Sequence, residues 1–324
     1  MGNVLSIENL NVTYINKKKR VMAVRNASLS VNRGDSLGLV GESGSGKSTL
    51  AMAILGLLPK RTTEITGRAV FLEESDLLSI GEKELNEIRW KKLAVVFQKA
   101  MNSLSPVHRI REIIEDIYRV HAPQASREEI RAVTEKLLKL VNLPERVYNL
   151  YPHEMSGGML QRVAIAISLL HQPQLLIFDE ATTALDVVTQ GQILEEIVQM
   201  EKELETTRIM ITHDMSVVAA SCTQIAVMYA GEIVETGPVK SVMIDPKHPY
   251  TKALLRSFPS LKGENEKMAS IPGFLPDLSK PCPYCAFAQR CADAGARCFR
   301  EKPLFAETAG GGGSACFLLQ GGVE

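Results

Sequence analysis

Residues 41–48 have the residue types and spacing of a loop that binds phosphate. They read Gly-Glu-Ser-Gly-Ser-Gly-Lys-Ser, which fits the pattern G-x-x-x-x-G-K-[ST], and they lie between an apolar run at 36–40 and a helical pattern that Pro59 is expected to end. The glycines let successive backbone N–H groups face an anion at a helix N-terminus. Lys47 is expected to neutralise the β- and γ-phosphates of a nucleotide, and the Ser48 hydroxyl to bind Mg²⁺. The alternative is an ordinary glycine-rich turn. The nucleotide-binding residues predicted here are Gly41, Glu42, Ser43, Gly44, Ser45, Gly46, Lys47, Ser48 and Thr49.

An acidic pair follows a second apolar run. Leu175 to Phe178 is a compact apolar segment, and Asp179 and Glu180 come directly after it. The carboxyl ends of strands are where open α/β folds bind ligands. Asp179 is therefore expected in the Mg²⁺ shell, and Glu180 is expected to polarise an attacking water. Such a pair alone is more often a solvated strand end, and its catalytic interpretation depends on the phosphate loop in the same chain.

A second glycine-led helix start occurs further along the chain. Ser156 is suited to cap a helix, and Gly157 and Gly158 leave its first N–H groups accessible, with Gln161 one turn later. This predicts a second helix end that can bind phosphate. Taken alone, the segment would be an ordinary capped helix.

The elements that must position these residues have the pattern of a doubly wound α/β core. Between about 103 and 149, apolar residues at three- and four-residue spacing predict a helical insert. Residues 259–324 are rich in proline and glycine and predict a loop-rich tail, with a flexible link at 310–313. The runs expected to form strands are 5–12, 28–31, 36–40, 175–178 and 208–212.

Composition excludes several classes of protein. The chain has 324 residues, of which 45% are hydrophobic, which is enough for a large core. Lysine plus arginine and aspartate plus glutamate both total 37, so no net charge attracts nucleic acid, and no nucleic-acid partner is expected. No apolar stretch is long enough to cross a bilayer, and residues 1–11 lack the pattern of a secretory signal. A cytoplasmic protein is expected, unless a partner holds it at a membrane.

Taken together, these motifs resemble the nucleotide-binding subunit of ABC transporters over about residues 4–258. The resemblance implies a P-loop NTPase core with an antiparallel β subdomain and a helical subdomain at about 99–157. It also implies ATP and Mg²⁺ as ligands, and two ATP sites shared across a dimer, in which the segment at Ser156 of one subunit closes over the γ-phosphate held by its partner. Met155, Leu160 and Ala181 depart from the family pattern without removing a catalytic group.

The same resemblance assigns roles to four more positions. Tyr14 is similar to the aromatic residue that stacks on adenine, and Gln98 to the glutamine that senses Mg²⁺ and couples to membrane subunits. Residues 184–186, which end in Asp186, are similar to the loop that crosses the dimer interface, and His213 to the histidine that contacts the γ-phosphate. The expected catalytic residues are thus Glu180, His213, Lys47 and Gln98.

The tail resembles the C-terminal extension of oligopeptide and dipeptide importer ATPases. The resemblance rests on the segment 248–255, on 271–273 and on the cysteines that follow. It implies a [4Fe-4S] cluster on Cys285, Cys291, Cys298 and Cys316. By spacing alone, zinc is an alternative because it also takes four cysteines, Cys282 could replace one ligand, and a metal-free tail is also open. Cys222 is expected to be a small core side chain.

The sequence therefore predicts a cassette at 1–258 and an extension at 259–324. The predicted function is ATP hydrolysis that powers uptake of oligopeptides or dipeptides, at the cytoplasmic face of the cell membrane. The expected partners are two transmembrane permease subunits, a second homologous ATPase subunit and an extracellular or periplasmic substrate-binding protein. The alternatives are an importer ATPase for nickel, a sugar or another small solute, an exporter ATPase, and a soluble ABC protein of DNA repair or translation.

Overall fold

The computed structural model describes residues 2–16, 19–98, 104–182, 186–257, 271–308 and 310–322. The chain divides into two compact units, which are described separately. Unit 1 combines residues 1–79 with 211–324, and unit 2 comprises residues 80–210. None of the described helices is both long and apolar enough to cross a membrane.

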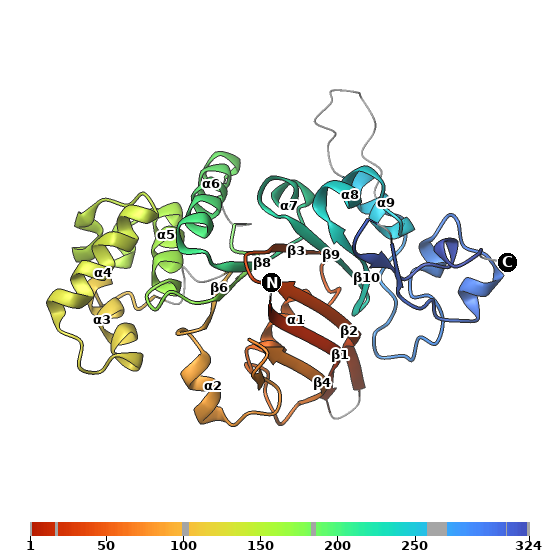
Figure 1. The fold of residues 1–324 in the computed structure, drawn as a ribbon, viewed down its shortest axis with the longest axis horizontal. Helices are drawn as coiled ribbons and strands as arrows, with labels where there is room; N and C mark the ends of the chain where they lie inside the picture. The colour runs from red at the N-terminus through yellow and green to blue at the C-terminus, as the bar shows by residue number, and fades with distance from the viewer. Residues whose placement is uncertain are drawn as a thin grey trace. The chain divides into compact units, whose positions relative to one another are not determined.

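Unit 1 contains two β-sheets with flanking helices (Figure 1). Its first half contains β1 (Asn3–Asn16), β2 (Lys19–Asn32), β3 (Ser36–Val40), α1 (Lys47–Ile54), β4 (Thr63–Phe71) and β5 (Ser75–Asp76). Its second half contains α7 (Met215–Ser221), β9 (Gln224–Tyr229), β10 (Glu232–Pro238), α8 (Val239–Ile244), α9 (Pro249–Arg256), β11 (Ala306–Glu307) and β12 (Gly313–Ser314), with 3₁₀ helices at Ala288–Arg290, Ala296–Phe299 and Phe317–Leu319.

The first sheet is antiparallel, in the order β2-β1-β4-β5. In β2 the buried residues Ala27, Leu29 and Val31 alternate with exposed residues, which is the period expected of a strand with one face on a core. This confirms the predicted strands in the first 32 residues and extends both of them. Of the basic run that lies between them, Lys17 and Lys18 fall outside the described residues.

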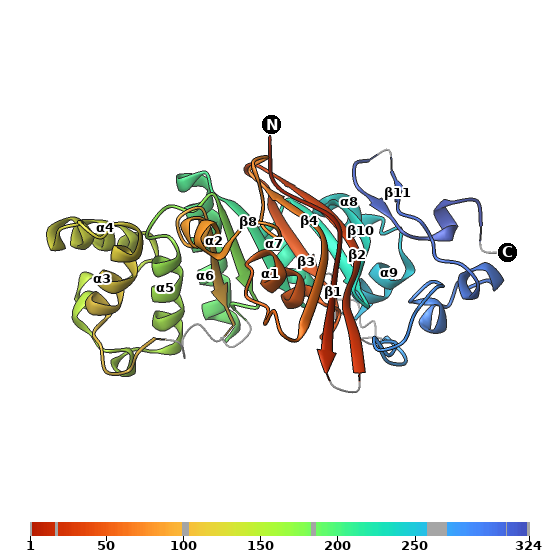
Figure 2. The same ribbon diagram turned by 90° about the horizontal axis from the view of Figure 1, so that it is seen from below.

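The second sheet of unit 1 runs β11-β12-β10-β9-β3. The predicted strand β3 is buried at all five positions and pairs in parallel with β9, from Leu37 opposite Gln224 to Val40 opposite Val227. The other pairs are antiparallel. Figure 2 shows α8 beside β10, against which it packs. The phosphate-loop segment thus begins at the end of a fully buried strand.

Helix α1 is shorter than the sequence pattern predicts. It ends at Ile54, several residues before Pro59. The cause is Gly56, whose φ of 63° is left-handed. Its N–H donates to the Ala53 carbonyl and the next N–H donates to the Met52 carbonyl, which is the Schellman arrangement that closes a helix C-terminus. The glycine ends the helix before the proline is reached.

The described tail residues pack onto unit 1. The glycines at 310–313 were expected to form a flexible link, but this expectation is wrong. Gly313 belongs to β12, which pairs with β10 and β11, so the glycine run lies in the turn of a small hairpin. An aromatic contact also ties the tail to the sheet, because the ring of Phe287 lies 5.2 Å from that of Tyr229 and 5.4 Å from that of Tyr250.

Unit 2 consists of a short parallel sheet and a group of helices. Its elements are α2 (Glu82–Ile88), β6 (Leu93–Phe97), α3 (Ile110–His121), α4 (Arg127–Leu140), α5 (Gly157–Ser168), β7 (Leu175–Asp179), α6 (Val187–Leu204) and most of β8 (Thr207–Thr212), with 3₁₀ helices at Glu145–Asn149 and Pro152–Glu154. Strand β7 lies between β6 and β8 and is buried throughout. Figure 1 shows α3, α4 and α5 as neighbouring helices. The predicted helical insert is therefore present, as are the strands predicted at 175–178 and 208–212.

Candidate phosphate-binding and catalytic site

The phosphate loop joins β3 to α1 in unit 1. Gly46 is the residue before α1 and has a φ of 107°, which side chains rarely allow. A Cβ at this position would lie 2.3 Å from the Ala23 carbonyl oxygen, so both conformation and space require glycine. The Gly231 N–H donates to the Ser45 carbonyl at 2.8 Å. Neighbouring backbone thus holds the loop in a curved conformation in which Gly46 cannot be replaced without strain.

Lys47 is folded back onto this loop. Its side chain is buried, and its ammonium donates to the carbonyls of Gly41 at 2.7 Å and Glu42 at 2.9 Å. The Ser45 hydroxyl lies 3.4 Å from the same nitrogen. These are neutral oxygens, so a phosphate oxygen would be a stronger partner for the ammonium. The arrangement places a cation at the N-terminus of α1, where the helix dipole also favours an anion.

Two other predicted residues lie in unit 1. The hydroxyl of Tyr14, on β1, is 3.2 Å from that of Thr49 on α1, so the tyrosine lies beside the phosphate-loop helix. His213 directly follows β8 and is exposed. The structure therefore places Tyr14 with the loop, while the contact of His213 with a γ-phosphate stays a prediction.

The two carboxylates predicted to take part in hydrolysis, Asp179 and Glu180, lie in unit 2 at the end of β7. Phe97 pairs with Asp179 across the parallel strands, so Gln98 and Glu180 follow at the same edge of the sheet. Asp179 is buried, with 8% of its surface exposed. Glu180 has a φ of 50°, a left-handed conformation that few non-glycine residues adopt and that is found at functional sites more often than elsewhere. The parallel register thus places Gln98, Asp179 and Glu180 at one edge of the sheet, and metal binding by them stays a prediction.

The glycine-led helix start predicted at Ser156 is α5. Ser156 is extended, and its hydroxyl accepts from the Met159 N–H at 3.3 Å, as expected for an N-cap. Gly158 lies against the following helix, because a Cβ there would be 2.9 Å from the Thr189 methyl carbon. Gln161 is fully buried, and neither of its amide atoms has a hydrogen-bond partner among the described residues. Gly157 is exposed.

Asp186 caps α6 in the same unit. Its carboxylate accepts from the Thr189 N–H at 2.9 Å and from the Thr189 hydroxyl at 2.7 Å. These hydrogen bonds lower the pKa of Asp186 below its usual range. Two other residues of the loop predicted at this position, Ala184 and Leu185, lie outside the described residues.

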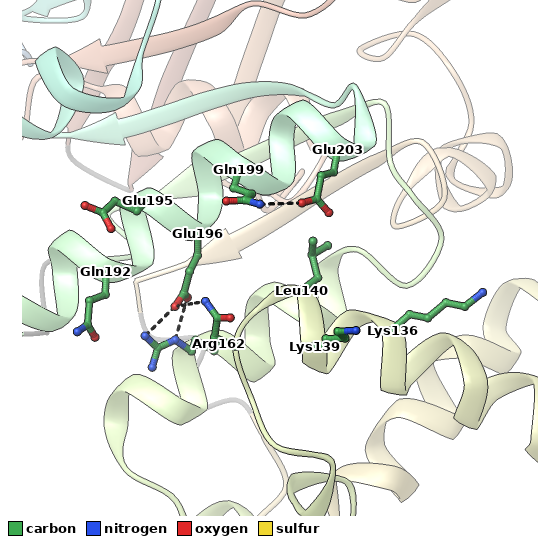
Figure 3. A pocket seen from close by; sticks show the side chains of 10 residues that line it. Lys136, Lys139, Leu140, Arg162, Gln192, Glu195, Glu196, Gln199 and Glu203 are labelled. Atoms are coloured by element: carbon green, nitrogen blue, oxygen red, sulfur yellow. Dashed lines mark hydrogen bonds and ion pairs between the residues drawn. The ribbon is translucent and has the colours of Figure 1, made fainter.

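A polar cavity of about 670 Å³ lies between α4, α5 and α6 (Figure 3). None of the predicted site residues lines it. Arg162 of α5 forms two hydrogen bonds with Glu196 of α6, at 2.8 and 3.0 Å. Both side chains are largely buried, so this ion pair is worth more than a surface pair and fixes α5 against α6. The helix starts at Ser156 and Asp186 are therefore parts of one packed pair of helices.

The four tail cysteines nominated by resemblance line one small cavity in unit 1. Cys285, Cys291, Cys298 and Cys316 surround a space of about 20 Å³, with His248 and two phenylalanine rings also in its wall. Burial raises the pKa of Cys285 to about 12 and that of Cys291 to about 11. Ionising these thiols in place is therefore costly unless a cation compensates.

The structure also separates the candidates for a metal ligand. Cys282 is absent from the cavity lining, and its thiol lies 3.4 Å from the Tyr284 carbonyl. Cys222 packs against the apolar core of unit 1, as expected. Among the described side chains, no three His, Cys, Asp or Glu are arranged to hold a metal ion. A tetrahedral zinc site would need sulfurs about 3.8 Å apart, because each Zn–S bond is about 2.3 Å long. The four cysteines match a Cys₄ ligand set in type and number only, and the cluster stays a prediction.

Two residues near the phosphate loop were missed by sequence reasoning. The Tyr250 hydroxyl accepts from the Glu42 N–H at 2.8 Å, and the Arg290 guanidinium donates to both oxygens of the Glu42 carboxylate. Tyr250 is part of the quoted tail segment and Arg290 precedes Cys291, but no local signal links either residue to a loop more than 200 positions away.

Comparison with known proteins identifies the family. A family model described as ABC transporter matches residues 24–183, and one described as the C-terminal region of oligopeptide/dipeptide transporters matches residues 234–298. A probable peptide ABC transporter ATP-binding protein of Sinorhizobium fredii is 41% identical over 317 residues, which cover 97% of this chain and 94% of that protein. The chain belongs to the ABC transporter ATP-binding family.

Other members of this ABC family agree with the assignment. The oligopeptide transport ATP-binding protein of Bacillus subtilis is 41% identical, covering 93% of this chain and 84% of that protein. A dimeric bacterial ABC transporter cassette of known structure has a TM-score of 0.65 and 30% identity, covering 72% of this chain and 98% of that one. The same cassette solved in a post-hydrolysis state, bound to ADP and Pi, has a TM-score of 0.64. The predicted ABC ATPase fold and ATP hydrolysis are therefore confirmed.

Proposed function

We propose that this chain is the ATP-hydrolysing subunit of an ABC importer that powers the uptake of oligopeptides or dipeptides. The observation that carries the proposal is the joining of an ABC cassette to the oligopeptide/dipeptide C-terminal region in one chain. Relatives named for peptide, oligopeptide and dipeptide transport, with about 40% identity along nearly the whole chain, support it.

In the proposed mechanism, Lys47 exchanges the carbonyls of Gly41 and Glu42 for the β- and γ-phosphates of ATP. Its ammonium moves from neutral acceptors to charged ones, which favours binding. Tyr14 stacks on the adenine. The backbone N–H groups at the start of α1 contribute further donors to the phosphates.

Hydrolysis needs charge neutralisation and an oriented water. Mg²⁺, when bound, would neutralise charge between the β- and γ-phosphates, and the residues that would hold it are Ser48, Gln98 and Asp179. Glu180 accepts a hydrogen bond from the attacking water and orients it in line with the γ-phosphate. His213 donates to the γ-phosphate.

A dimer completes the site in this proposal. The α5 start of one subunit, with Ser156 and Gly158, covers the nucleotide held by the phosphate loop of the other subunit, and the loop at Asp186 lies at the interface. We propose that the second subunit is a related ATPase, that two permease subunits hold the pair at the cytoplasmic face of the membrane, and that a substrate-binding protein delivers the peptide.

The hydrolytic role of Glu180 is tested by Glu180→Gln in the purified transporter. We expect ATP binding to persist, the closed dimer to be stabilised and hydrolysis to fall about 100-fold or more, because the amide cannot act as a base. Glu205→Gln is the matched control, since Glu205 also has a left-handed backbone, with φ of 51°, but lies at the end of α6. Turnover near the unmodified rate in the Glu180 variant would remove the assigned role.

The cargo is tested with the transporter reconstituted in vesicles with its binding protein. We expect ATP hydrolysis to be stimulated by short peptides and labelled dipeptide to accumulate in an ATP-dependent manner. Stimulation by nickel or by a sugar, with peptides inert, would replace peptide by that cargo.

We further propose that Cys285, Cys291, Cys298 and Cys316 hold a [4Fe-4S] cluster. The four thiols that surround one cavity support this ligand set, and the exclusion of Cys282 from the cavity favours it over other combinations. In this assignment the four thiolates would bind the irons, and the phenylalanine rings in the cavity wall would shield them from solvent.

Protein purified without oxygen is expected to contain iron and acid-labile sulfide. Cys298→Ser should lower the content of both, while the control Cys282→Ser should retain them. Zinc in place of iron and sulfide would refute the cluster.

A further inference from the structure

The C-terminal extension contacts the phosphate loop through one arginine. Arg290 lies in the 3₁₀ helix between two cavity cysteines, and its guanidinium forms a two-pronged ion pair with Glu42, the second residue of the loop. The two N–H···O distances are 2.7 and 2.9 Å. The Arg290 side chain is 5% exposed and that of Glu42 26% exposed, so the pair is shielded from solvent and its hydrogen bonds are of the strong, charge-assisted kind.

Arg290 is itself held in place by the surrounding chain. Its Nε donates to the Pro272 carbonyl at 2.8 Å, and one terminal nitrogen donates to the Ile271 carbonyl at 3.3 Å. The other terminal nitrogen lies 3.3 Å from the Tyr229 hydroxyl. These hydrogen bonds to backbone carbonyls fix the position of the guanidinium. The ion pair therefore restrains the position of the Glu42 side chain.

The backbone of the loop is held at the same residue. The Glu42 N–H donates to the hydroxyl of Tyr250, a fully buried residue of α9. Tyr250 packs against Tyr229 and Phe287, with ring centroids 4.6 and 5.4 Å away. Both the main chain and the side chain of Glu42 are thus fixed by residues from the C-terminal part of the molecule.

A second contact covers the loop nearby. A Cβ on Gly44 would lie 3.6 Å from the Leu275 side chain, so residues of the extension lie directly against the loop. The irregular segment that contains Leu275 is also tied to β2, because the Met22 N–H and the Arg25 guanidinium donate to the Leu278 carbonyl at 2.9 and 3.2 Å. The extension is therefore anchored on both sides of its contact with the loop.

The charge on Glu42 explains why the contact matters. A carboxylate in a loop that binds phosphates repels the ligand, and it can also compete with phosphate for the ammonium of Lys47, which already contacts the Glu42 carbonyl at 2.9 Å. Arg290 neutralises the carboxylate by donating to both of its oxygens. Without that arginine, the negative charge would remain beside the anion site, where partial burial strengthens the repulsion.

We propose that the C-terminal extension is a clamp on the phosphate loop, in which Arg290 and Tyr250 are positioning residues that set the affinity for nucleotide. The inference rests on nucleotide binding at the loop but on neither the cargo nor the cluster. It gives the extension a function within the ATPase cycle that is separate from any binding of a metal or cluster by its cysteines.

The test compares Arg290→Ala with a matched control in the full-length chain. Arg297→Ala is the control, because Arg297 also directly precedes a cavity cysteine and also forms an ion pair. Its partners are Glu301 and the Phe317 ring, both of which belong to the extension and not to the phosphate loop. Binding of ATP, ADP and adenosine is measured by titration calorimetry, together with the melting temperature and the iron content. The iron content is expected to be equal in the two variants.

The expected signature depends on phosphate charge. Arg290→Ala should bind ATP about tenfold more weakly, ADP less affected and adenosine unchanged, because a single uncompensated charge acts on the phosphates alone. At saturating ATP, kcat should be kept while KM rises. Arg297→Ala should bind all three ligands as the unmodified chain does.

A second substitution separates electrostatics from simple unfolding. Glu42→Gln together with Arg290→Ala removes the repelling charge, so ATP affinity should return to that of Glu42→Gln alone. Equal losses for ATP and adenosine, a selective loss of iron, or no recovery in the double variant would overturn the clamp. The clamp would also be overturned if Arg290→Ala bound ATP as tightly as the unmodified chain does. If the unmodified chain bound no nucleotide, the proposed function would fail instead.

Discussion

The phosphate loop and the α5 start both place glycine at the beginning of a helix, but for different physical reasons. Gly46 has a left-handed backbone, and the atom that a side chain would meet is a backbone oxygen of Ala23. Gly158 lies within an ordinary helix after a regular N-cap, and the atom that a side chain would meet is the methyl carbon of Thr189. One glycine is required by conformation, the other by a side-chain contact.

The two helix starts also differ in what holds them in place. The phosphate loop has left-handed glycines and is held by distant residues of unit 1, namely Arg290 and Tyr250. The α5 start needs no unusual backbone and is braced by the neighbouring helix α6, through Arg162 and Glu196. Substitutions should therefore be tolerated differently at the two sites.

The largest effect is expected for Gly46→Ala. The new Cβ meets backbone in a left-handed conformation, so no side-chain movement can relieve the strain, and ATP binding should fall about 100-fold. Gly191→Ala in α6 is the control, because a Cβ there meets nothing within 4 Å. Calorimetric titration measures both variants. Wild-type affinity in Gly46→Ala would mean that the loop can adopt a different curl.

A smaller and reversible effect is expected for Gly158→Ala. The added methyl displaces Thr189 and shifts α5 against α6, which should lower ATP hydrolysis by the assembled transporter about tenfold. Thr189→Ser removes the obstructing methyl but retains the hydroxyl that donates to Asp186. The double variant should recover to the activity of Thr189→Ser alone. Failure to recover would show that the glycine is needed for its backbone, as in the phosphate loop.

The smallest effect is expected for the cap of α6. Asp186→Ala removes the acceptor for the Thr189 N–H and should lower the melting temperature by about 2 °C, whereas Asp186→Asn should retain most of the cap. The lowered pKa of Asp186 means that its contribution is fully present at neutral pH and is lost as the pH falls through that lowered value. The unmodified chain and the alanine variant should converge in acid. A difference that persisted there would contradict a charged cap.

Much of the site was predictable because its signals are local. The phosphate loop, the acidic pair after β7 and the cap at Ser156 are each contiguous runs, so their residue types and spacing can be read along the chain. The strand assignments followed in the same way from runs of buried residues. Helix α1 was misjudged at its end, since Gly56 competes with Pro59 as a stop signal and the sequence does not show which acts first.

The sequence by itself determined which residues could bind a nucleotide and where on the elements they lie. Only the tertiary structure decided that Cys282 stays outside the cysteine cavity and that Glu42 is neutralised by Arg290, 248 positions away. The physical reason is that the backbone conformation at a residue depends mainly on its neighbours along the chain. Ion pairs, close helix contacts and ligand sets depend instead on which distant residues the fold brings together.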